Sequence, residues 1–417
     1  MVDTAPGGDI AENARADTAW THHSVTRWLL REGRLIDQPA PFVGALGRAI
    51  VAAGAPIWRV RMGQRILDPL IGATSATWRR DTDRTDQTVV PHGYRSTPQY
   101  ENSPAQHVIE KRRTYRQRLT NLDRSIHHDV LYDLAAAGGT DYFCCPVVMG
   151  DDEVQMVAFA TDHPGGFSDH DLHQLGEIAQ SVGPAMDIMS LRLTMNRLLE
   201  TYLGRGTARQ VLAGAFRRGD VQYIQAAVMY ADLRDFTGLT SRLPPDVVLH
   251  ALGDFFEVLV AAVHGADGEV LKFMGDAVLA LFPAPPDGGA EAACAAALDA
   301  AGSAIQSLNA VSRRRVAAGR VPFDFGLTLD LGPVAYGNIG GPDRLDFTAI
   351  GASVNLVSRM QDLCKSLGER VLMSGSFAEA AALGGLTVET CGDHTIRGVP
   401  DRVSIYRPAP CALPGKG

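Results

Sequence analysis

Residues 268–282 read GEVLKFMGDAVLALF and show a strand pattern on both sides of a short turn. Glu269 to Met274 and Ala277 to Phe282 are short and mostly apolar, and Gly275-Asp276 separates them. This pattern predicts a β-hairpin with an aspartate at its tip. Lys272 places a charge inside the first strand, so it either has a binding partner or lies on a solvated strand face.

A second stretch with aspartates precedes the hairpin. Tyr223 to Tyr230 is apolar enough for a buried strand, and ADLRDFTGLT (231–240) then turns into a helix. Free N–H groups at a helix start suit a phosphate, and Asp232 beside them suits a divalent metal, although Asp232 or Asp235 could equally cap the helix. Together with Asp276, Asp232 forms the pair of carboxylates that two-metal phosphoryl and nucleotidyl transfer uses.

The third cluster runs from Gly326 to Met360. Gly326 to Gly341 (GLTLDLGPVAYGNIGG) predicts an apolar strand followed by a glycine-rich stretch, and Arg344 to Met360 predicts a turn leading into a helix. Asn355 and Arg359 are four residues apart in that helix, so they project from one face. Arginine suits a phosphate that gains charge and asparagine can orient a ribose, but an ordinary solvated helix face has the same residues.

The first half of the chain predicts another mixed α/β module. Its segment from Trp78 to Ser103 is polar and rich in turn residues, which predicts a long irregular loop that either covers a ligand or is simply solvated. The elements expected around it are a helix at Phe42–Ala52 and strands at Pro56–Arg61, Tyr142–Val148 and Val154–Ala160.

A long helical segment is expected between the two halves. Ser168, with Asp171 three residues later, predicts an N-cap that opens an amphipathic helix. Further along, five apolar residues follow a 3-4-3-4 spacing, which is the seam of a short parallel coiled coil between two chains or the stripe of an ordinary linker helix. These residues are Ile188, Leu191, Met195, Leu198 and Tyr202.

Composition limits the remaining function classes. The 417 residues predict two or three domains, and 46% hydrophobic with 21% charged residues is typical of globular proteins. The net charge of −8 argues against a nucleic-acid or anionic-membrane partner, both of which need a basic face. Six cysteines without metal-ligand spacing indicate reduced thiols, and neither a signal peptide nor an uncharged apolar run of about 18 residues is evident. A cytoplasmic location is therefore expected.

Four stretches of the second half resemble, in order and spacing, the catalytic domain of class III nucleotidyl cyclases. They are YADLRDFTGLT (230–240), GEVLKFMGDAVLALF (268–282), YGNIGGPDRLDFTAIGASVNLVSRM (336–360) and IRGVPDRVSIY (396–406).

The first 190 residues resemble a GAF-type sensor domain through the order of their elements and the FSDHDL helix start. The resemblance implies an α/β (α+β) chain with a ferredoxin-like cyclase domain. The expected segments are a disordered tail (1–27), a GAF-like sensor domain (28–187), a helical linker (188–220), the cyclase domain (221–407) and a second tail (408–417).

The cyclase resemblance also implies roles for individual residues. Asp232, Asp276 and the backbone carbonyl of Leu233 would bind two Mg²⁺ or Mn²⁺ ions. Lys272 and Thr348 would read the purine, and the lysine favours ATP over GTP; many members have aspartate where this chain has Thr348, so it belongs with the Thr-bearing subgroup. The remaining expected contacts with substrate are Asn355 to the ribose, Arg359 to the α-phosphate, Arg397 to the terminal phosphates, and Phe236 and Thr237.

The implied activity is an adenylyl cyclase that makes 3′,5′-cyclic AMP and pyrophosphate under control of a small-molecule or protein signal at the sensor domain. Lys272 and Asp276 lie roughly 13 Å apart along an extended strand, so one chain would struggle to bring both to one nucleotide. The family's arrangement, a head-to-tail homodimer with sites at the interface, resolves this. Two alternatives stay open: a guanylyl cyclase, or a weak or inactive nucleotide-binding regulator, because Asp235 replaces a glycine that is common in this motif.

Overall fold

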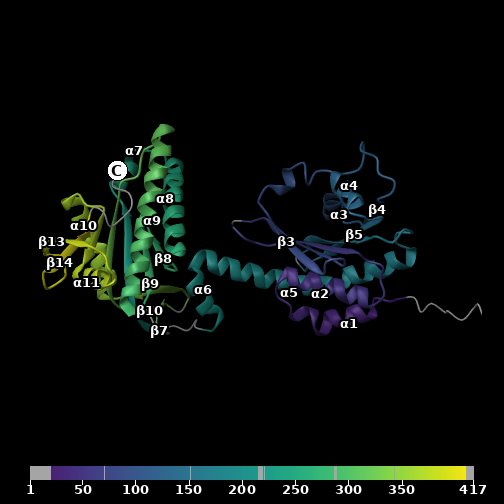
Figure 1. Ribbon diagram of the computed structural model, residues 1–417, viewed down its shortest axis with the longest axis horizontal. Helices are drawn as coiled ribbons and strands as arrows, with labels where there is room; N and C mark the ends of the chain where they lie inside the picture. Colours follow the sequence, from purple (N-terminus) through teal and green to yellow (C-terminus); the bar gives the residue numbers. More distant parts are fainter. Residues whose placement is uncertain are drawn as a thin grey trace, which may run out of the picture. The chain divides into compact units, whose positions relative to one another are not determined.

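The computed structural model describes residues 20–69, 71–150, 152–214, 219, 221–285, 289–341 and 343–409. The chain divides into two compact units, Met1–Leu198 and Leu199–Gly417, and each combines helices with one sheet, which confirms a mixed α+β fold (Figure 1). Most of the two expected tails lies outside the described residues. Helix α1 (His23–Arg31) overlaps the end of the tail expected at 1–27, because Val25 and Leu29 are buried in the first unit.

The first unit is built on a six-stranded antiparallel sheet. Its strand order is β3-β2-β1-β6-β5-β4. The strands are β1 (Arg59–Arg65), β2 (Ala73–Arg79), β3 (Arg84–Val90), β4 (Tyr115–Arg118), β5 (Asp141–Val148) and β6 (Val154–Thr161). Residues alternate between the two faces, so Val60 and Met62 of β1 enter one apolar core while Arg59 and Arg61 point to the opposite face.

Helices cover both faces of this sheet. Those on the face of Val60 and Met62 build the larger core, and those on the other face build a smaller core around Val108 and Leu131 (Figure 1). The first group is α1, α2 (Pro39–Ala52) and the start of α5 (Asp169–Leu203), and the second is α3 (Pro104–Lys111) and α4 (Asp129–Ala136). Two short turns of 3₁₀ helix, η1 (Gly33–Leu35) and η2 (Tyr94–Ser96), complete the unit.

The predictions for the first half are confirmed at α2, β5 and β6, but two others are wrong. Strand β1 begins three residues after the predicted strand at 56–61. The predicted loop at 78–103 contains the end of β2 and the whole of β3. Strand β3 was not predicted because it is an exposed edge strand without apolar alternation. It forms by pairing with β2.

The start of α5 follows the predicted capping pattern. The Asp171 N–H donates to Ser168 Oγ at 3.2 Å, and the Ser168 N–H donates to Asp171 Oδ2 at 2.9 Å. This reciprocal pair satisfies two backbone donors at the helix start. Farther along α5, three residues of the 3-4-3-4 seam are well exposed, with exposed fractions of 71% for Leu191, 48% for Met195 and 77% for Tyr202.

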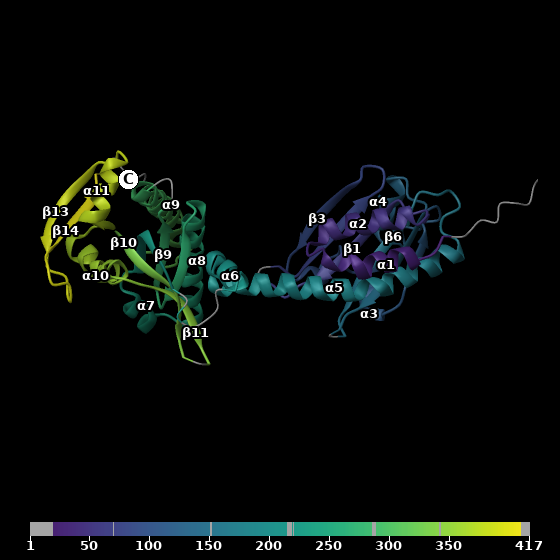
Figure 2. The same cartoon turned by 90° about the horizontal axis from the view of Figure 1, so that it is seen from below.

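The second unit is built on an eight-stranded sheet. Seven strands follow the order β13-β14-β12-β10-β7-β9-β8, and the eighth, β11, pairs with β10 (Figure 2). The strands are β7 (Val221–Leu233), β8 (Glu269–Met274), β9 (Ala277–Pro283), β10 (Phe325–Gly340), β11 (Leu345–Ile350), β12 (Val371–Ser374), β13 (Val388–His394) and β14 (Val403–Pro408).

Helices pack on both faces of the second sheet as well. The main core joins Met229 and Ala231 of β7 to Phe255 and Phe377 on the helices of one face, and Val357 lies in a smaller core on the other face. The first group is α8 (Pro245–Gly265), α9 (Gly289–Ala317) and α11 (Gly375–Leu383), and α10 (Ala352–Leu367) covers the other face. The unit also contains α6 (Arg205–Leu212) and α7 (Phe236–Arg242).

By length and composition, helix α8 is apolar enough to cross a membrane, the one such helix found among the described residues. It contains Asp246, Asp254 and Glu257, so it is not an uncharged apolar run of the kind considered in the sequence. In the fold, Phe255, Leu259 and Val263 are buried against the sheet, so α8 packs as a core helix of the second unit.

The predicted strands of the second half are confirmed at the hairpin, where β8 and β9 flank Gly275-Asp276. Two details differ. Strand β10 continues through the glycine-rich stretch, because β7 and β11 pair along its two sides. The turn predicted before α10 contains β11, a short strand that exists only through its pairing with β10.

Candidate active site

Asp232 and Asp276 are brought together by the sheet. Asp232 is the next-to-last residue of β7, where it pairs with Ala277 of β9 on one side and Gly326 of β10 on the other. Asp276 immediately precedes Ala277 at the tip of the hairpin. Backbone pairing therefore sets the two carboxyl groups side by side, as the sequence predicted.

The electrostatics of this pair suit a divalent cation. Asp232 Oδ1 is buried and has no hydrogen-bond partner among the described residues. Burial, followed by the charge of Asp276, raises the pKa of Asp232 to about 7. A divalent cation on both carboxylates would remove their repulsion and supply the missing partner. No cluster of three or more His, Cys, Asp or Glu that could hold a metal is found among the described residues, so further ligands would come from the backbone, water or a substrate phosphate.

Residues around the aspartate pair are also affected by burial and by the charges of the two carboxyl groups. Burial, with added effects of Asp232 and Asp276, raises the pKa of the Tyr230 hydroxyl to about 12. Gln361 of α10 donates to the backbone oxygen of Tyr230 at 2.9 Å, and the charge of Asp362 acts on Asp232. The sequence interpretation missed Gln361 and Asp362, because only the packing of α10 against β7 brings them near the pair. It gave no role to Tyr230, which precedes Asp232 by two residues in β7.

Lys272, the charged residue inside strand β8, has a partner within the same chain. Its Nζ forms an ion pair with Asp346 Oδ2 of β11. Thr348 lies two residues farther along β11, on the same face as Asp346, whereas Phe347 between them is buried. The structure thus brings Lys272 and Thr348 into one neighbourhood, and Asp346 is a third member that the sequence interpretation did not include.

Helix α10 carries Asn355 and Arg359 on one exposed face, as predicted from their spacing. The guanidinium of Arg359 lies against Gly398, where an added Cβ would come within 3.0 Å of it. Gly398 adopts a positive φ of 71° in the turn between β13 and β14, next to the exposed Arg397. The two predicted phosphate arginines, Arg359 and Arg397, therefore lie in adjoining segments.

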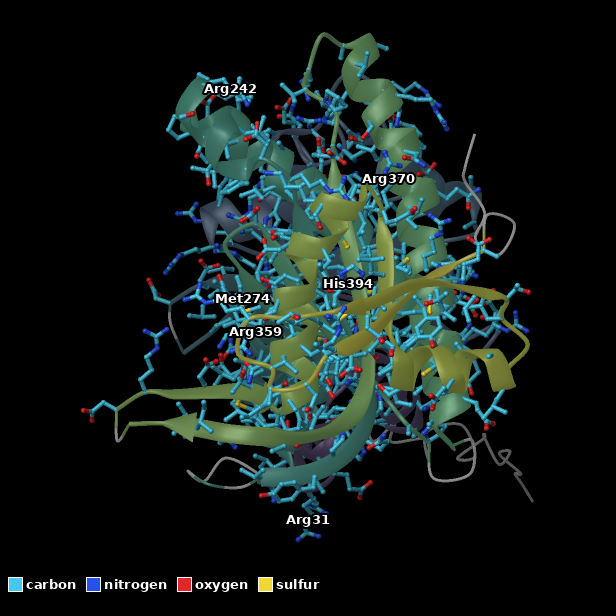
Figure 3. The ribbon with its side chains drawn as sticks, turned by 90° about the vertical axis from the view of Figure 1, so that its left-hand side faces the viewer. Arg31, Arg242, Met274, Arg359, Arg370 and His394 are labelled. Carbon is cyan, nitrogen blue, oxygen red and sulfur yellow. The ribbon has the colours of Figure 1, made fainter. Side chains whose placement is uncertain are left out.

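Helix α7 follows Asp232 after a tight turn. Asp235 takes the left-handed conformation with φ 56°, which favours glycine, and its carboxylate accepts from Arg242 at 2.6 Å. In Figure 3, Arg242 lies at the far edge of this unit from Arg359. Phe236 is half-buried against the main core and Thr237 is exposed. The charge of Asp235 is thus balanced by Arg242, which removes the expected excess of negative charge at this turn.

Three groups of predicted residues result: the aspartate pair with Leu233, the Lys272 and Thr348 neighbourhood, and the exposed face of α10. Among the described residues, no hydrogen bond or ion pair connects Asp232 or Asp276 to the other two groups.

The comparison with known families gives this arrangement a context. The family model of the adenylate and guanylate cyclase catalytic domain matches residues 220–407. This part of the chain is thus similar to members of that family. The match contains every predicted site residue, and members of this family bind a nucleotide substrate, work as dimers and generally depend on Mg²⁺ or Mn²⁺.

Curated relatives resemble the cyclase domain at modest identity. Adenylate cyclase 1 of Rhizobium meliloti is 29% identical over 199 residues, which cover 46% of this chain and 29% of the relative. The terminal-differentiation specific adenylate cyclase of Dictyostelium discoideum is 26% identical over 191 residues, covering 45% of this chain and 9% of the relative. An uncharacterized protein of Mycobacterium tuberculosis is 28% identical over 252 residues, covering 58% and 43%. The aligned part is less than half of each relative's own length.

Solved structures of cyclases are also similar to this chain. An adenylyl cyclase from P. aeruginosa is 24% identical and covers 45% of this chain and 95% of that chain, with a TM-score of 0.42. A guanylyl cyclase is 28% identical and covers 47% and 98%, with a TM-score of 0.40. The matching family model covers both adenylate and guanylate cyclases, so the family match leaves the choice between ATP and GTP open.

Proposed function

We propose that the chain is an adenylyl cyclase that converts ATP to 3′,5′-cyclic AMP and pyrophosphate, a phosphorus–oxygen lyase. The observation that carries this proposal is the carboxylate pair of Asp232 and Asp276, with a buried oxygen that lacks a partner, inside a cyclase-family domain. Such a pair fits the metal ions that polyphosphate substrates require.

The remaining chemistry is assigned to side chains that bind and orient ATP. Two Mg²⁺ or Mn²⁺ ions, held by Asp232, Asp276 and the Leu233 carbonyl, would lower the pKa of the ribose 3′-hydroxyl and offset the charge of the leaving pyrophosphate. Asn355 hydrogen-bonds the ribose and keeps the 3′-oxygen in line with the α-phosphorus. Arg359 stabilises the charge that grows on the α-phosphate, and Arg397 binds the terminal phosphates together with the N-terminal turn of α7 at Phe236 and Thr237.

The preference for ATP rests on Lys272 and its neighbours. An ammonium group only donates hydrogen bonds, so it suits the ring nitrogen acceptors of adenine, and the Thr348 hydroxyl can accept from the adenine amino group. Guanine presents the O6 acceptor where adenine has its amino group and an N1–H donor where adenine has a ring acceptor, so its N1–H needs an acceptor. The nearest carboxylate, Asp346, is engaged by Lys272, which supports adenine as the base.

The proposal includes a homodimer with two shared sites. The aspartate pair of one copy would face Lys272, Thr348, Asn355 and Arg359 of the other, since one chain presents these groups separately. The exposed seam residues of α5, Leu191, Met195 and Tyr202 among them, supply an apolar stripe that would pair the two copies next to the cyclase domain.

The first unit is proposed to be a GAF-like sensor that regulates the cyclase domain. The proposed organisation keeps the expected segments, with the sensor at 28–187, the linker at 188–220 and the cyclase domain at 221–407. A cytoplasmic location goes with this proposal, because ATP is available there and the described cysteines are free thiols.

A direct assay tests the activity. Purified full-length protein is incubated with ATP or GTP and with Mg²⁺ or Mn²⁺, and both cyclic nucleotides are measured beside an Asp276→Ala variant. The expected result is cyclic AMP that is lost in the variant. A faster rate with GTP would replace adenylyl by guanylyl cyclase, and ATP binding without turnover in Mn²⁺ would indicate an inactive regulator.

A further inference from the structure

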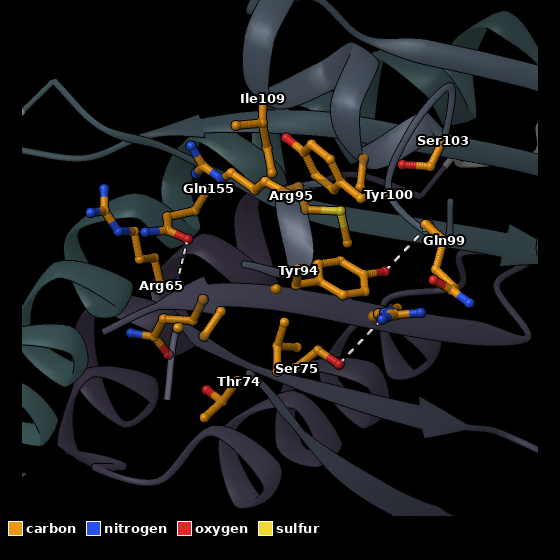
Figure 4. Close-up of a pocket in the computed structure, with 18 of the residues that line it drawn as sticks. Arg65, Thr74, Ser75, Tyr94, Arg95, Gln99, Tyr100, Ser103, Ile109 and Gln155 are labelled. Atoms are coloured by element: carbon orange, nitrogen blue, oxygen red, sulfur yellow. Dashed lines mark hydrogen bonds between the residues drawn. The ribbon is translucent and has the colours of Figure 1, made fainter. Parts of the chain in front are cut away.

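The first unit contains a cavity of about 380 Å³, which lies within the size range of small-molecule sites. Its floor is the face of β1 and β2 that carries Arg61 and Ser75, and its roof is the segment from Pro91 to Ala105 with Tyr94 and Tyr100 (Figure 4). Part of its wall, from Val90 to Ser103, belongs to the segment predicted as a loop, and the cavity is separate from the cyclase domain in the chain.

Positive charge collects in this cavity without a matching negative charge. Four arginines line it, and Asp68 is the one carboxylate among the described lining residues. Asp68 is paired with Arg197 at 3.6 Å, and Arg65 is paired with Glu153. The other three lining arginines, Arg59, Arg61 and Arg95, form no ion pair with a described residue.

Arg59 and Arg61 are the informative members. They are two residues apart on one face of β1, so their side chains leave the sheet as neighbours. Arg61 donates to Ser75 Oγ at 3.3 Å, while its Nε is buried without a partner. Burial, together with the nearby charge of Arg61, lowers the pKa of Arg59 to about 10. Arg59 and Arg61 are half-buried, and a guanidinium group that is partly removed from water without a carboxylate costs stability unless an anion joins it.

The rest of the wall is apolar and partly aromatic. Tyr100 and Met156 are only 3% and 5% exposed, and Ile109 of α3 lines the same space. The rings of Tyr94 and Tyr100 meet at 5.8 Å with an angle of 64° between their planes. These surfaces suit a flat apolar body attached to the charged group of a ligand.

We propose that this cavity is a binding site for a small organic anion, with its carboxylate or phosphate on Arg59 and Arg61 and its flat apolar body against Tyr94, Tyr100 and Met156. A carboxylate and a phosphate both accept the paired donors that arginine presents. A metal cation would be repelled by the arginines, and a neutral ligand would leave their charge unbalanced. The site therefore selects for charge first and for shape second.

Binding to the full chain tests the proposal. Benzoate, phenyl phosphate and the neutral benzyl alcohol share one aromatic body, and each is titrated into the protein by calorimetry. At least one of the two anions is expected to bind and the alcohol to bind at least about tenfold more weakly, since the neutral group leaves both arginines uncompensated. Tighter binding of benzoate or of phenyl phosphate identifies the natural charged group as a carboxylate or a phosphate.

Matched variants connect binding to the arginines. Arg61→Gln is expected to weaken the anion at least about tenfold, Arg61→Lys to restore part of the loss, and Arg27→Gln, on the exposed face of α1, to change nothing. Thermal unfolding of each variant without ligand confirms that it folds. The proposal is overturned if neither anion binds, if benzyl alcohol binds as tightly as the anions, or if Arg61→Gln binds like the unchanged protein.

Discussion

Backbone pairing on both sides of β7 positions Asp232, whereas no hydrogen-bond partner holds its side-chain oxygen Oδ1. The carboxyl group lies beside Asp276, and Oδ1 is buried without a partner among the described residues. Such a residue destabilises the metal-free fold and gains a partner when a cation binds. Its effect on stability should therefore depend on metal.

Asp232→Asn is predicted to stabilise the metal-free protein by on the order of 1 kcal/mol and to abolish stabilisation by Mn²⁺. Unchanged protein should gain about 2.7 kcal/mol when Mn²⁺ is present at 100 times its dissociation constant. Thermal unfolding with and without MnCl₂, in the absence of nucleotide, measures both effects. Asp235→Asn is the matched control, because this exposed acid is paired with Arg242 and should leave the Mn²⁺ response intact. An equal Mn²⁺ response in Asp232→Asn would contradict the metal assignment.

Lys272→Gln tests whether Lys272 determines the preference for adenine over guanine. Removing the ammonium group is predicted to lower kcat/KM for ATP by about tenfold or more, with a smaller change for GTP, because an adenine acceptor loses its charged donor. Asp346→Asn serves as the comparison, since it keeps Lys272 and removes only its partner. Steady-state rates with both nucleotides measure the ratio. Equal losses for ATP and GTP would assign Lys272 a structural role.

The sequence could predict the residues of the site but not their neighbours. Asp232 and Asp276 were found because both stand at strand ends beside turns, and Asn355 and Arg359 because helical spacing puts them on one face. Asp346 could not be found, because its contact with Lys272 depends on the register of β11 on β10. That register comes from long-range pairing, which local sequence patterns do not encode.

The start of α5 is stabilised by a carboxylate with three hydrogen bonds. Ser168 donates twice to Asp171, and the Trp20 indole donates to it at 2.7 Å. Burial raises the pKa of Asp171, but these hydrogen bonds outweigh burial and leave the pKa below its ordinary value of 3.8. A carboxyl group with a lowered pKa stabilises the fold above its unfolded pKa and loses this effect as the pH falls through its folded pKa.

Asp171→Asn is predicted to cost about 1–2 kcal/mol of unfolding free energy at pH 7. The difference from the unchanged protein should shrink as the pH falls below 3.8, because the wild-type carboxyl is then protonated as well. Urea unfolding at several pH values measures the trend. A difference that stays constant down to the lowest pH at which the protein folds would contradict the role of the charge.

Helix α6 is attached to the cyclase sheet through Glu269 at the start of β8. The Glu269 carboxylate accepts from the Thr207 N–H at 2.8 Å and from the Tyr336 hydroxyl at 2.9 Å. Gly206 is packed so closely beside it that an added Cβ would lie 2.2 Å from Glu269 Oε2. This contact ties the segment that follows α5 to the strand that carries Lys272.

Gly206→Ala is predicted to destabilise the second unit by about 1–3 kcal/mol, because the methyl group displaces Glu269. Without that contact, the same change inside a helix would stabilise by up to about 1 kcal/mol. Gly253→Ala in α8, where an added Cβ meets nothing within 4 Å, should show this stabilising sign. Denaturant unfolding of the two variants compares the signs, and stabilisation by Gly206→Ala would contradict the described contact.

At the level of whole elements, the sequence predicted strands and helices that bury an apolar face. It did not predict β3, an exposed strand that exists through pairing with β2, or β11, a short strand in a stretch predicted as a turn. It also placed in a loop the segment from Val90 to Ser103, which forms part of the cavity wall. Edge strands show only weak alternation of apolar and polar residues, so this alternation in the sequence does not reveal them.

The two units differ in the candidate sites that they contain. The first has a charged cavity and no predicted catalytic residue, and the second contains the family match with all of the candidate catalytic residues. Among the described residues, no hydrogen bond or ion pair joins the aspartate pair to Lys272, Asn355 or Arg359. The proposed shared site draws these groups from two copies, and the exposed seam of α5 offers a surface for that pairing.

The most direct test mixes two inactive variants, Asp276→Ala and Arg359→Ala, and measures cyclic AMP formation. Each variant alone should be inactive, because it spoils both sites of its own dimer. In an equal mixture with free exchange, half of the dimers contain one copy of each variant and have one intact site, so activity should recover to about a quarter of the unchanged protein. If the mixture stays inactive while size measurements show mixed dimers, the shared site, and with it the proposed arrangement of the cyclase domains, is wrong.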